Sequence, residues 1–377
     1  MTPWQPTVKK LHNEPAPLQD ERERLRKGRA LFREGRQDEA RVEFEALLAS
    51  NPKSANACLG IGMVLRRQEH TEEALIRFIQ ARTLDPLLSK AYVLEGQALA
   101  ELGQIEPAIM AFQNALNLDS KSVKAMTGLG QALLRQQRYA EATNPLREAL
   151  RYDPRKVQPR LLLAEIHRQQ EQPDAAIAEL RLALDIEPGH MRAAISLARL
   201  LAAQNQRELA EQALRDVLAR LPEDSAALMQ LGRAALELQL YPVAEEALNE
   251  ALRQDPGRTS VRLRLVEAQL ANGHLEEAEQ QARELPQNSQ ISPLVHKLLG
   301  DIHYRRQQFQ LAVEEYRATV LHLPDHEQLL SDLEHELAVS EGEWEELAEE
   351  LQPSIANRVA DETRRLRQNR RNRNRRA

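Results

Sequence analysis

The histidines of this chain are poorly placed for metal or acid–base chemistry. His296 and His303 are two helical turns apart, a spacing more typical of packing or surface positions than of ligation. His322 and His326 have the four-residue spacing of a helical ligand pair, but Pro324 lies between them and disrupts the helix that such a pair requires. We therefore expect no metal site.

Other catalytic signatures are absent from the sequence. It contains no GxxxxGK[ST] phosphate loop, no GxGxxG after a strand, no GxSxG and no HExxH. Carboxylates are so abundant that pairs of them carry no information without geometry. The single cysteine, Cys58, excludes an internal disulfide and a cysteine-based metal site. We expect a protein that is not an enzyme and needs no cofactor.

The composition predicts an all-α protein. Apolar residues make up 42% and charged residues 29%, whereas aromatic residues reach only 3%. Ala, Leu, Glu, Arg and Gln dominate, and these residues lose little entropy in a helix. No apolar run approaches the roughly 18 residues that span a bilayer, and the first residues, MTPWQPTVKKL, do not form a secretory signal. A cytoplasmic protein that is not transmembrane is the expectation.

Three kinds of residue recur every 34 positions. Proline or a substitute stands at 52, 86, 120, 154, 188, 222, 256, 290 and 324. Alanine stands twelve residues before each of these, from Ala40 to Ala312. Twelve residues earlier again the residue is Gly or Ala, except for Val266. Small residues allow two helices to approach closely, and proline ends a helix because it lacks an N–H. The period therefore predicts repeated helical hairpins.

This pattern resembles the tetratricopeptide repeat family, with a small residue at position 8, Ala at 20, an aromatic residue or Leu at 24 and Pro at 32. Position 24 is filled by Phe44, Phe78, Phe112, Leu146, Leu180, Leu214, Leu248, Ala282 and Tyr316. The eighth repeat, with Val266, Ala282 and Gln290, is the weakest match. The resemblance implies a right-handed α-solenoid of about nine repeats over residues 21–326, acting as a protein-binding scaffold or adaptor.

The ends differ from the repeats. Residues 1–20 contain four prolines and no helical period, so we predict a disordered lead. Residues 327–353 are predicted to form a degenerate repeat with an acidic surface that caps the solenoid. Residues 354–377 are predicted to form a helix that runs into an arginine-rich tail.

The resemblance also implies that the first helix of each repeat lines a concave groove through positions 2, 5, 9, 12 and 13. The candidate partner-binding residues at these positions are Arg29, Arg33, Met63, Arg66, Arg67, Lys90, Lys124, Arg135, Arg168, Arg192, Arg199 and Arg233. The same positions hold fewer anions, namely Glu101, Glu165, Glu237, Glu267 and Asp301. Although the chain has a net charge of -6, the groove is basic, and we expect it to bind an acidic peptide or helix. The alternative is that these charges are solvated and paired along the helices.

The tail offers a second function. Its arginines are Arg364, Arg365, Arg367, Arg370, Arg371, Arg373, Arg375 and Arg376, interleaved with Asn and Gln. Such a segment suits weak, non-specific contact with nucleic acid or another anionic surface, because it lacks aromatic residues for base stacking. A solvated tail is the competing interpretation. An acidic cap and a basic groove on one chain would also permit self-association.

Overall fold

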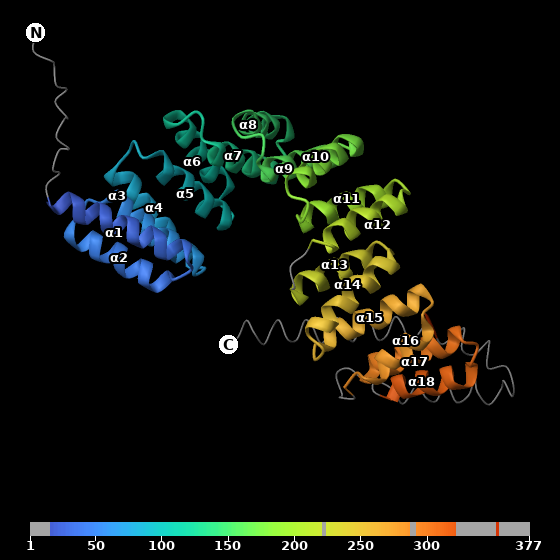
Figure 1. The fold of residues 1–377 in the computed structure, drawn as a ribbon. Helices are drawn as coiled ribbons and strands as arrows, with labels where there is room; N and C mark the ends of the chain where they lie inside the picture. The colour runs from blue at the N-terminus through green and yellow to red at the C-terminus, as the bar shows by residue number, and fades with distance from the viewer. Residues whose placement is uncertain (1–15, 221–223, 287–291, 322–351, 354–377) are drawn as a thin grey trace, which may run out of the picture. The chain divides into compact units, whose positions relative to one another are not determined.

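The structure is a computed structural model that describes residues 16–220, 224–286, 292–321 and 352–353 (Figure 1). These residues form helices joined by short turns, with no strand among them. The chain divides into two compact units, one ending at Ile186 and the other beginning at Glu187, and each is described by itself. In the described part, no helix combines the length and the apolar character that crossing a membrane requires.

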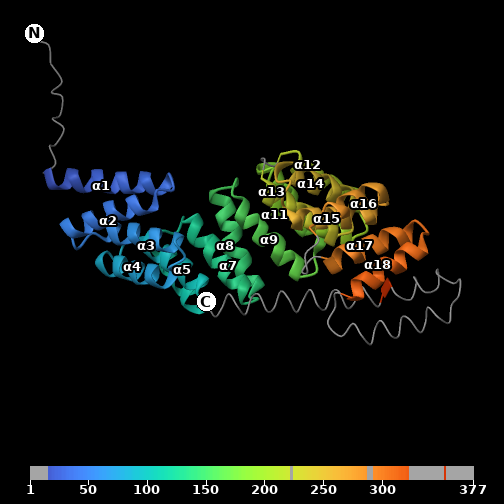
Figure 2. The same cartoon turned by 90° about the horizontal axis from the view of Figure 1, so that it is seen from below.

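Five hairpins make up the described part of the first unit. Its helices are α1 (Ala16–Arg33), α2 (Gln37–Ser50), α3 (Ala55–Arg67), α4 (Thr71–Leu84), α5 (Ser89–Glu101), α6 (Ile105–Leu118), α7 (Val123–Arg135), α8 (Tyr139–Tyr152), α9 (Val157–Gln169) and α10 (Pro173–Ile186). Each odd-numbered helix packs against the helix that follows, and each even-numbered helix up to α8 packs against the next hairpin. Figure 2 shows the same stacking from below.

Four hairpins make up the described part of the second unit. Its helices are α11 (Met191–Ala203), α12 (Arg207–Leu218), α13 (Ser225–Glu237), α14 (Tyr241–Gln254), α15 (Thr259–Asn272), α16 (Leu275–Arg283), α17 (Ser292–Arg305) and α18 (Phe309–Leu321). The hairpins pack in sequence, as they do in the first unit. Paired helices stacked in this way confirm the predicted all-α solenoid of helical repeats.

The core of each hairpin depends on the small residue at position 8. A Cβ atom placed on Gly96 would lie 2.8 Å from the Phe112 ring of the same repeat, so the ring occupies the space that a side chain would need. Gly62 and Phe78 repeat this arrangement in the preceding hairpin. The glycine at this position therefore admits a buried aromatic ring between two closely packed helices.

The turn inside each hairpin has a feature that the sequence pattern did not reveal. Position 15 has a positive φ in every repeat: the residues are Gly35, Glu69, Gly103, Gln137, Glu171, Asn205, Gln239, Gly273 and Gln307. Only three of the nine are glycine, the residue that adopts this left-handed conformation without strain. The same backbone turn is therefore formed by side chains for which it is unfavourable.

The boundaries differ from the expected ones in two places. Helix α1 begins at Ala16, before residue 21, where the sequence pattern places the first repeat. Helix α16 has only 9 residues and ends at Arg283. Pro286 explains the early end, because a proline disfavours the helical conformation in the residue before it and cannot continue the helix.

Candidate protein-binding groove

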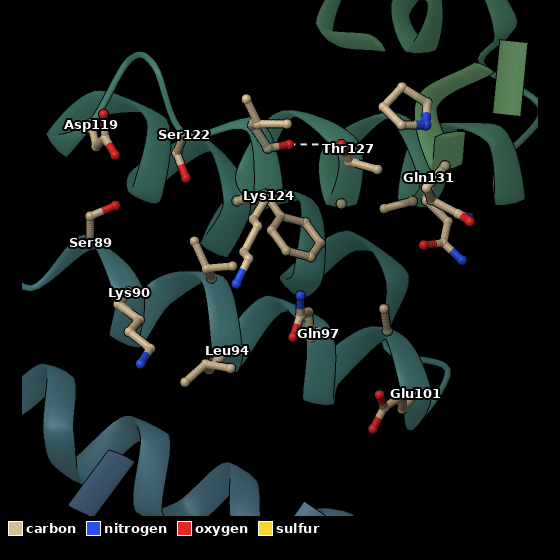
Figure 3. A pocket seen from close by; sticks show the side chains of 18 of the residues that line it. Ser89, Lys90, Leu94, Gln97, Glu101, Asp119, Ser122, Lys124, Thr127 and Gln131 are labelled. Atoms are coloured by element: carbon tan, nitrogen blue, oxygen red, sulfur yellow. Dashed lines mark hydrogen bonds between the residues drawn. The ribbon is translucent and has the colours of Figure 1, made fainter. Parts of the chain in front are cut away.

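A groove runs along the first helices of repeats 2 to 5 in the first unit. Its volume is about 920 Å³, and it is lined mainly by α3, α5, α7 and the start of α9. The predicted residues Met63, Arg66, Lys90, Lys124 and Arg135 all line it. Figure 3 shows the side chains that α5 and α7 contribute.

Apolar side chains provide part of the groove surface. Met63 is half-buried, and Val93 and Leu94 are almost fully buried beside it on the next first helix. Pro159 in the first turn of α9 continues the apolar lining. Of these residues, Met63 keeps apolar area that a partner can contact, while Val93, Leu94 and Pro159 form the buried floor of the groove.

Lys90 and Lys124 are an exposed basic pair in the groove. Within the described part of the chain, no carboxylate oxygen lies within 4 Å of either ammonium group. Although the Lys90 side chain stays exposed, the groove wall partly desolvates its ammonium group and lowers its pKa, and the positive charges of Arg29 and Lys124 lower it further. Lys90 on α5 is therefore close enough to Arg29 on α1 and to Lys124 on α7 to be repelled by both, and an anion beside it would relieve this repulsion.

Two other predicted cations of this unit, Arg66 and Arg135, donate hydrogen bonds to uncharged groups. The Arg66 guanidinium donates to Gln97 Oε1 at 2.5 Å and lies 3.9 Å from Glu101. Arg135 donates to the carbonyl oxygen of Ala100 at 2.6 Å. A carbonyl partner leaves the positive charge uncompensated, so Arg135 adds to the field of the groove.

The remaining predicted arginines on α1 and α3 are Arg29, Arg33 and Arg67. Arg29 donates to Asn56 Oδ1 at 2.9 Å. Arg67 donates to the carbonyl oxygen of Phe32 at 3.0 Å and lies over the Phe32 ring, 5.2 Å from its centroid. Arg33 is exposed at the end of α1. All three are cations on first helices, but none of them lines the groove of repeats 2 to 5.

Arg168 is neutralised within its own helix. Its guanidinium forms two hydrogen bonds with the Glu165 carboxylate, at 2.9 and 2.6 Å. This pairing raises the pKa of Arg168 and lowers the pKa of Glu165. Here the alternative interpretation of the sequence, charges paired along the helix, describes the structure.

The predicted cations of the second unit are mostly paired too. Glu237 lies 3.1 Å from Arg199 and 3.6 Å from Arg233, so one carboxylate serves two guanidinium groups. Arg192 is exposed near the start of α11. The structure thus separates the predicted residues into a cluster with unpaired lysines in the first unit and a set in the second unit in which two of the three cations share one carboxylate.

One predicted groove anion is buried instead. Asp301 is only 5% exposed, and it accepts a hydrogen bond from the Tyr316 hydroxyl at 2.9 Å. Lys297 is its second partner, 2.5 Å away. Burial and the Asp301 charge raise the pKa of Tyr316, which keeps its hydroxyl a donor. The expectation that Asp301 faces the groove was wrong, because Tyr316 at position 24 carries a hydroxyl that needs a buried acceptor.

The charge-based prediction missed several groove residues. Gln97 and Gln131 occupy position 9 and line the groove with their amides, but the candidate set held only charged residues and Met63. Lys156 lines the groove from the loop before α9, outside the five expected positions, and lies 3.6 Å from Asp153. Counting amides at position 9 would have found the first two.

Histidine and cysteine side chains lie away from this groove. His296 contacts Glu315 at 2.7 Å, whereas His303 contacts Gln308 at 2.8 Å, so the two rings of α17 have different partners. Cys58 is buried, and burial raises the pKa of its thiol. Among the described residues, no three His, Cys, Asp or Glu side chains form a group that would hold a metal ion.

Several predicted features lie outside the described residues. They are the second histidine pair, most of the lead over residues 1–20, nearly all of the capping segment 327–353 and the arginine-rich segment 354–377. The candidate site therefore rests on the helices α1 to α9 of the first unit.

Sequence models of the tetratricopeptide repeat match most of the repeat region. One matches residues 133–183 and 235–302, a second residues 25–86 and 195–259, and a third, described as TPR repeat, residues 96–137. Together they cover more than half of the chain. No curated protein matches the sequence.

Solved structures of repeat proteins are also similar. A tetratricopeptide repeat protein from Parabacteroides merdae is 17% identical, covers 66% of this chain and 99% of its own, and has a TM-score of 0.49. The pilF protein of Pseudomonas aeruginosa is 22% identical, covers 57% of this chain and 96% of its own, and has a TM-score of 0.44. A thermophilic TPR protein of Thermus thermophilus is 22% identical, covers 48% of this chain and 98% of its own, and has a TM-score of 0.43. On the repeat pattern, the stacked hairpins and the three family matches, the chain belongs to the tetratricopeptide repeat family, whose members generally mediate protein–protein interactions.

Proposed function

We propose that this protein is a non-catalytic adaptor whose first unit binds an acidic segment of a partner protein in the groove of repeats 2 to 5. The observation that carries the proposal is the pair Lys90 and Lys124, which has no carboxylate within 4 Å in the described part of the chain. Arg29 adds a third positive charge near Lys90. An acidic side chain between them would replace repulsion by attraction.

The surroundings of the lysines favour a peptide over a small anion. Apolar surface from Met63 lies in the same groove, and the amides of Gln97 and Gln131 can form hydrogen bonds with a peptide backbone. The Gln97 oxygen already accepts from Arg66, so its NH₂ group remains a donor for a partner carbonyl. Charge, apolar area and amide donors together suit an extended or helical acidic segment.

A peptide selection tests the proposal directly. We would select 12-residue peptides from a random display library against the full chain. The affinities of the selected peptides would then be measured by fluorescence polarisation. We expect enrichment in Asp and Glu. The double variant Lys90→Gln/Lys124→Gln should lose affinity about tenfold or more, because two partly desolvated charge contacts disappear.

The matched control removes the same charge where the structure shows it to be paired. Arg199→Gln/Arg233→Gln deletes two groove cations that share Glu237, and it should leave the affinity within about twofold. Peptides without an acidic preference, or equal losses in both double variants, would overturn the proposal. Binding of single-stranded RNA that competes with the selected peptides and depends on Lys90 and Lys124 would assign the groove to nucleic acid instead.

A further inference from the structure

The second helices of the first three repeats each expose a large apolar side chain at the same repeat position. Val42 on α2, Ile76 on α4 and Met110 on α6 are 63%, 65% and 63% exposed, and they occupy the same repeat position, 34 residues apart. We call these three residues the outer row. Ile79, one turn after Ile76 on α4, is also exposed and widens the row at its centre.

The outer row points away from the hairpin core. Ala40, Phe44 and Leu47 are the buried residues of α2. At 100° per residue, Val42 lies about 160–200° from Ala40 and Phe44 around the helix, on the opposite side. The row is therefore not an edge of the core but a separate apolar surface on the outside of the second helices.

The remaining six repeats have no large apolar residue at this position. Five of them carry a polar or charged residue and one carries alanine: Asn144, Ala178, Gln212, Glu246, Gln280 and Glu314. Scattered exposed apolar residues are normal on protein surfaces. Three large ones in phase, confined to three consecutive repeats, form a pattern that a random surface does not explain.

Charges one helical turn before the outer row have one sign. The residues there are Asp38, Glu72 and Glu106, all exposed. Asp38 accepts a hydrogen bond from Gln68, and Glu106 lies 3.7 Å from Arg138, whereas Glu72 has no hydrogen-bonding or charged partner in the described part of the chain.

The residue one helical turn after the outer-row position differs in charge between the first three repeats and the later ones. In five of the later repeats it carries an arginine, namely Arg147, Arg181, Arg215, Arg283 and Arg317. In the first three repeats the corresponding residues are Glu45, Ile79 and Gln113. These positions one turn before and one turn after the outer row are thus acidic or neutral and never basic.

We infer that the outer row is a docking surface for a basic amphipathic helix of a partner protein. A helix with one apolar face and flanking Lys or Arg satisfies both features of the surface, the apolar row and the carboxylates beside it. An anionic membrane is disfavoured by the same carboxylates. This surface lies on the second helices and does not depend on the groove lysines, so it would let one unit hold two partners of opposite charge.

The test uses a designed 18-residue peptide with leucines on one helical face and Lys and Arg beside them, titrated onto the full chain by fluorescence polarisation. The variant Ile76→Ser/Met110→Ser should weaken binding at least tenfold, since two apolar contacts are lost. Glu72→Lys should weaken it about threefold, with a smaller loss at high salt. All three positions are exposed, so we expect these variants to keep the fold.

Controls separate this surface from bulk charge and from the groove. Asn144→Ser/Gln212→Ser changes the same repeat position where it is polar and should leave binding unchanged, as should Lys90→Gln/Lys124→Gln. Equal binding of a shuffled peptide of the same composition would overturn the inference, as would an unchanged affinity of the outer-row variant. Tighter binding of a peptide with the sequence of residues 354–377 would also overturn it, by making this chain its own occupant.

Discussion

The third and eighth repeats fill the same two core positions in opposite ways. In the third repeat, Gly96 on α5 faces Phe112 on α6. In the eighth, the corresponding residues are Val266 on α15 and Ala282 on α16, and both are fully buried in one apolar cluster. The large side chain comes from the second helix in one hairpin and from the first helix in the other.

This difference shows that the repeat conserves filled volume and not the identity of a residue. A small residue at position 8, Gly or Ala, is needed only where position 24 carries a ring or a leucine side chain. When position 24 shrinks to alanine, position 8 can grow to valine. The two departures that make the eighth repeat a weak match to the family pattern therefore compensate each other.

The largest expected effect comes from breaking this match in the third repeat. Gly96→Val would place its Cβ 2.8 Å from the Phe112 ring and add two methyl groups beyond it, so we expect a loss of about 3 kcal/mol or more in the stability of this hairpin. Phe112→Ala should cost about 3–5 kcal/mol through the cavity that it leaves. Hydrogen exchange of the α5 and α6 amides measures both.

The double variant Gly96→Val/Phe112→Ala recreates the eighth repeat in the third. Its loss should be smaller than the sum of the two single losses by about 2 kcal/mol, because the valine occupies part of the cavity. Strict additivity would show that the side chains at positions 8 and 24 do not occupy the same space. It would contradict the explanation of the eighth repeat by compensating volumes.

The junctions between adjacent repeats also fill corresponding positions in different ways. Leu116 and Leu129 pack in the cluster that joins repeats three and four, whereas the corresponding positions between repeats two and three hold Arg82 and Glu95. The guanidinium Nε lies 3.0 Å from the carboxylate, but the N–H is not aligned for a hydrogen bond. Glu95 is 8% exposed, so this junction replaces an apolar contact with a buried charge contact.

Removing one member of this pair should have the second largest effect. Glu95→Leu leaves Arg82 without its carboxylate and should destabilise the junction by about 1–3 kcal/mol, a moderate value because the Arg82 side chain is 37% exposed. Arg82→Leu/Glu95→Leu copies the next junction and should be neutral or stabilising. A double variant less stable than either single variant would contradict this.

The pair also predicts a pH dependence. Burial raises the pKa of Glu95 above its usual value of 4.5, although Arg82 opposes the shift. For a carboxyl group with a raised folded pKa, the associated stability is fully present below pH 4.5 and is lost as the pH rises through the folded pKa. The wild-type chain should therefore lose stability relative to the double variant as the pH rises toward neutrality, which hydrogen exchange at several pH values measures.

Sequence reasoning captured the features that depend on one repeated position at a time. The 34-residue period, the glycine and alanine positions and the weakness of the eighth repeat were all visible in the letters. It missed features that depend on two side chains meeting, such as Glu237 lying between Arg199 and Arg233 or Tyr316 bonding Asp301. The backbone turn at position 15 was also missed, because side chains other than glycine adopt it in six repeats.

That turn provides a smaller test of the comparison between repeats. A Cβ on Gly103 would meet nothing within 4 Å, so Gly103→Ala should cost only the backbone strain of a positive φ, about 1 kcal/mol. Gln137→Gly makes the opposite change at the same position of the next repeat and should be neutral or stabilising. Thermal unfolding followed by circular dichroism compares the two. If both changes destabilise equally, the strain of a positive φ does not distinguish glycine from other residues at position 15.

The smallest expected effect concerns the paired arginines of the second unit. Glu237→Gln leaves Arg199 and Arg233 without their shared carboxylate and should change stability by less than about 1 kcal/mol, since all three side chains are exposed. If pairing is what keeps these arginines from attracting acidic peptides, the variant should gain about two- to threefold in affinity for the selected acidic peptides. The affinity should be measured in the Lys90→Gln/Lys124→Gln background, where binding at the first unit is weakened.

The matched control is Glu267→Gln, which removes the partner of Arg264, a residue outside the candidate set. This control should give no gain in affinity. An equal gain in both variants would mean that net charge, and not the freeing of particular arginines, attracts the peptide.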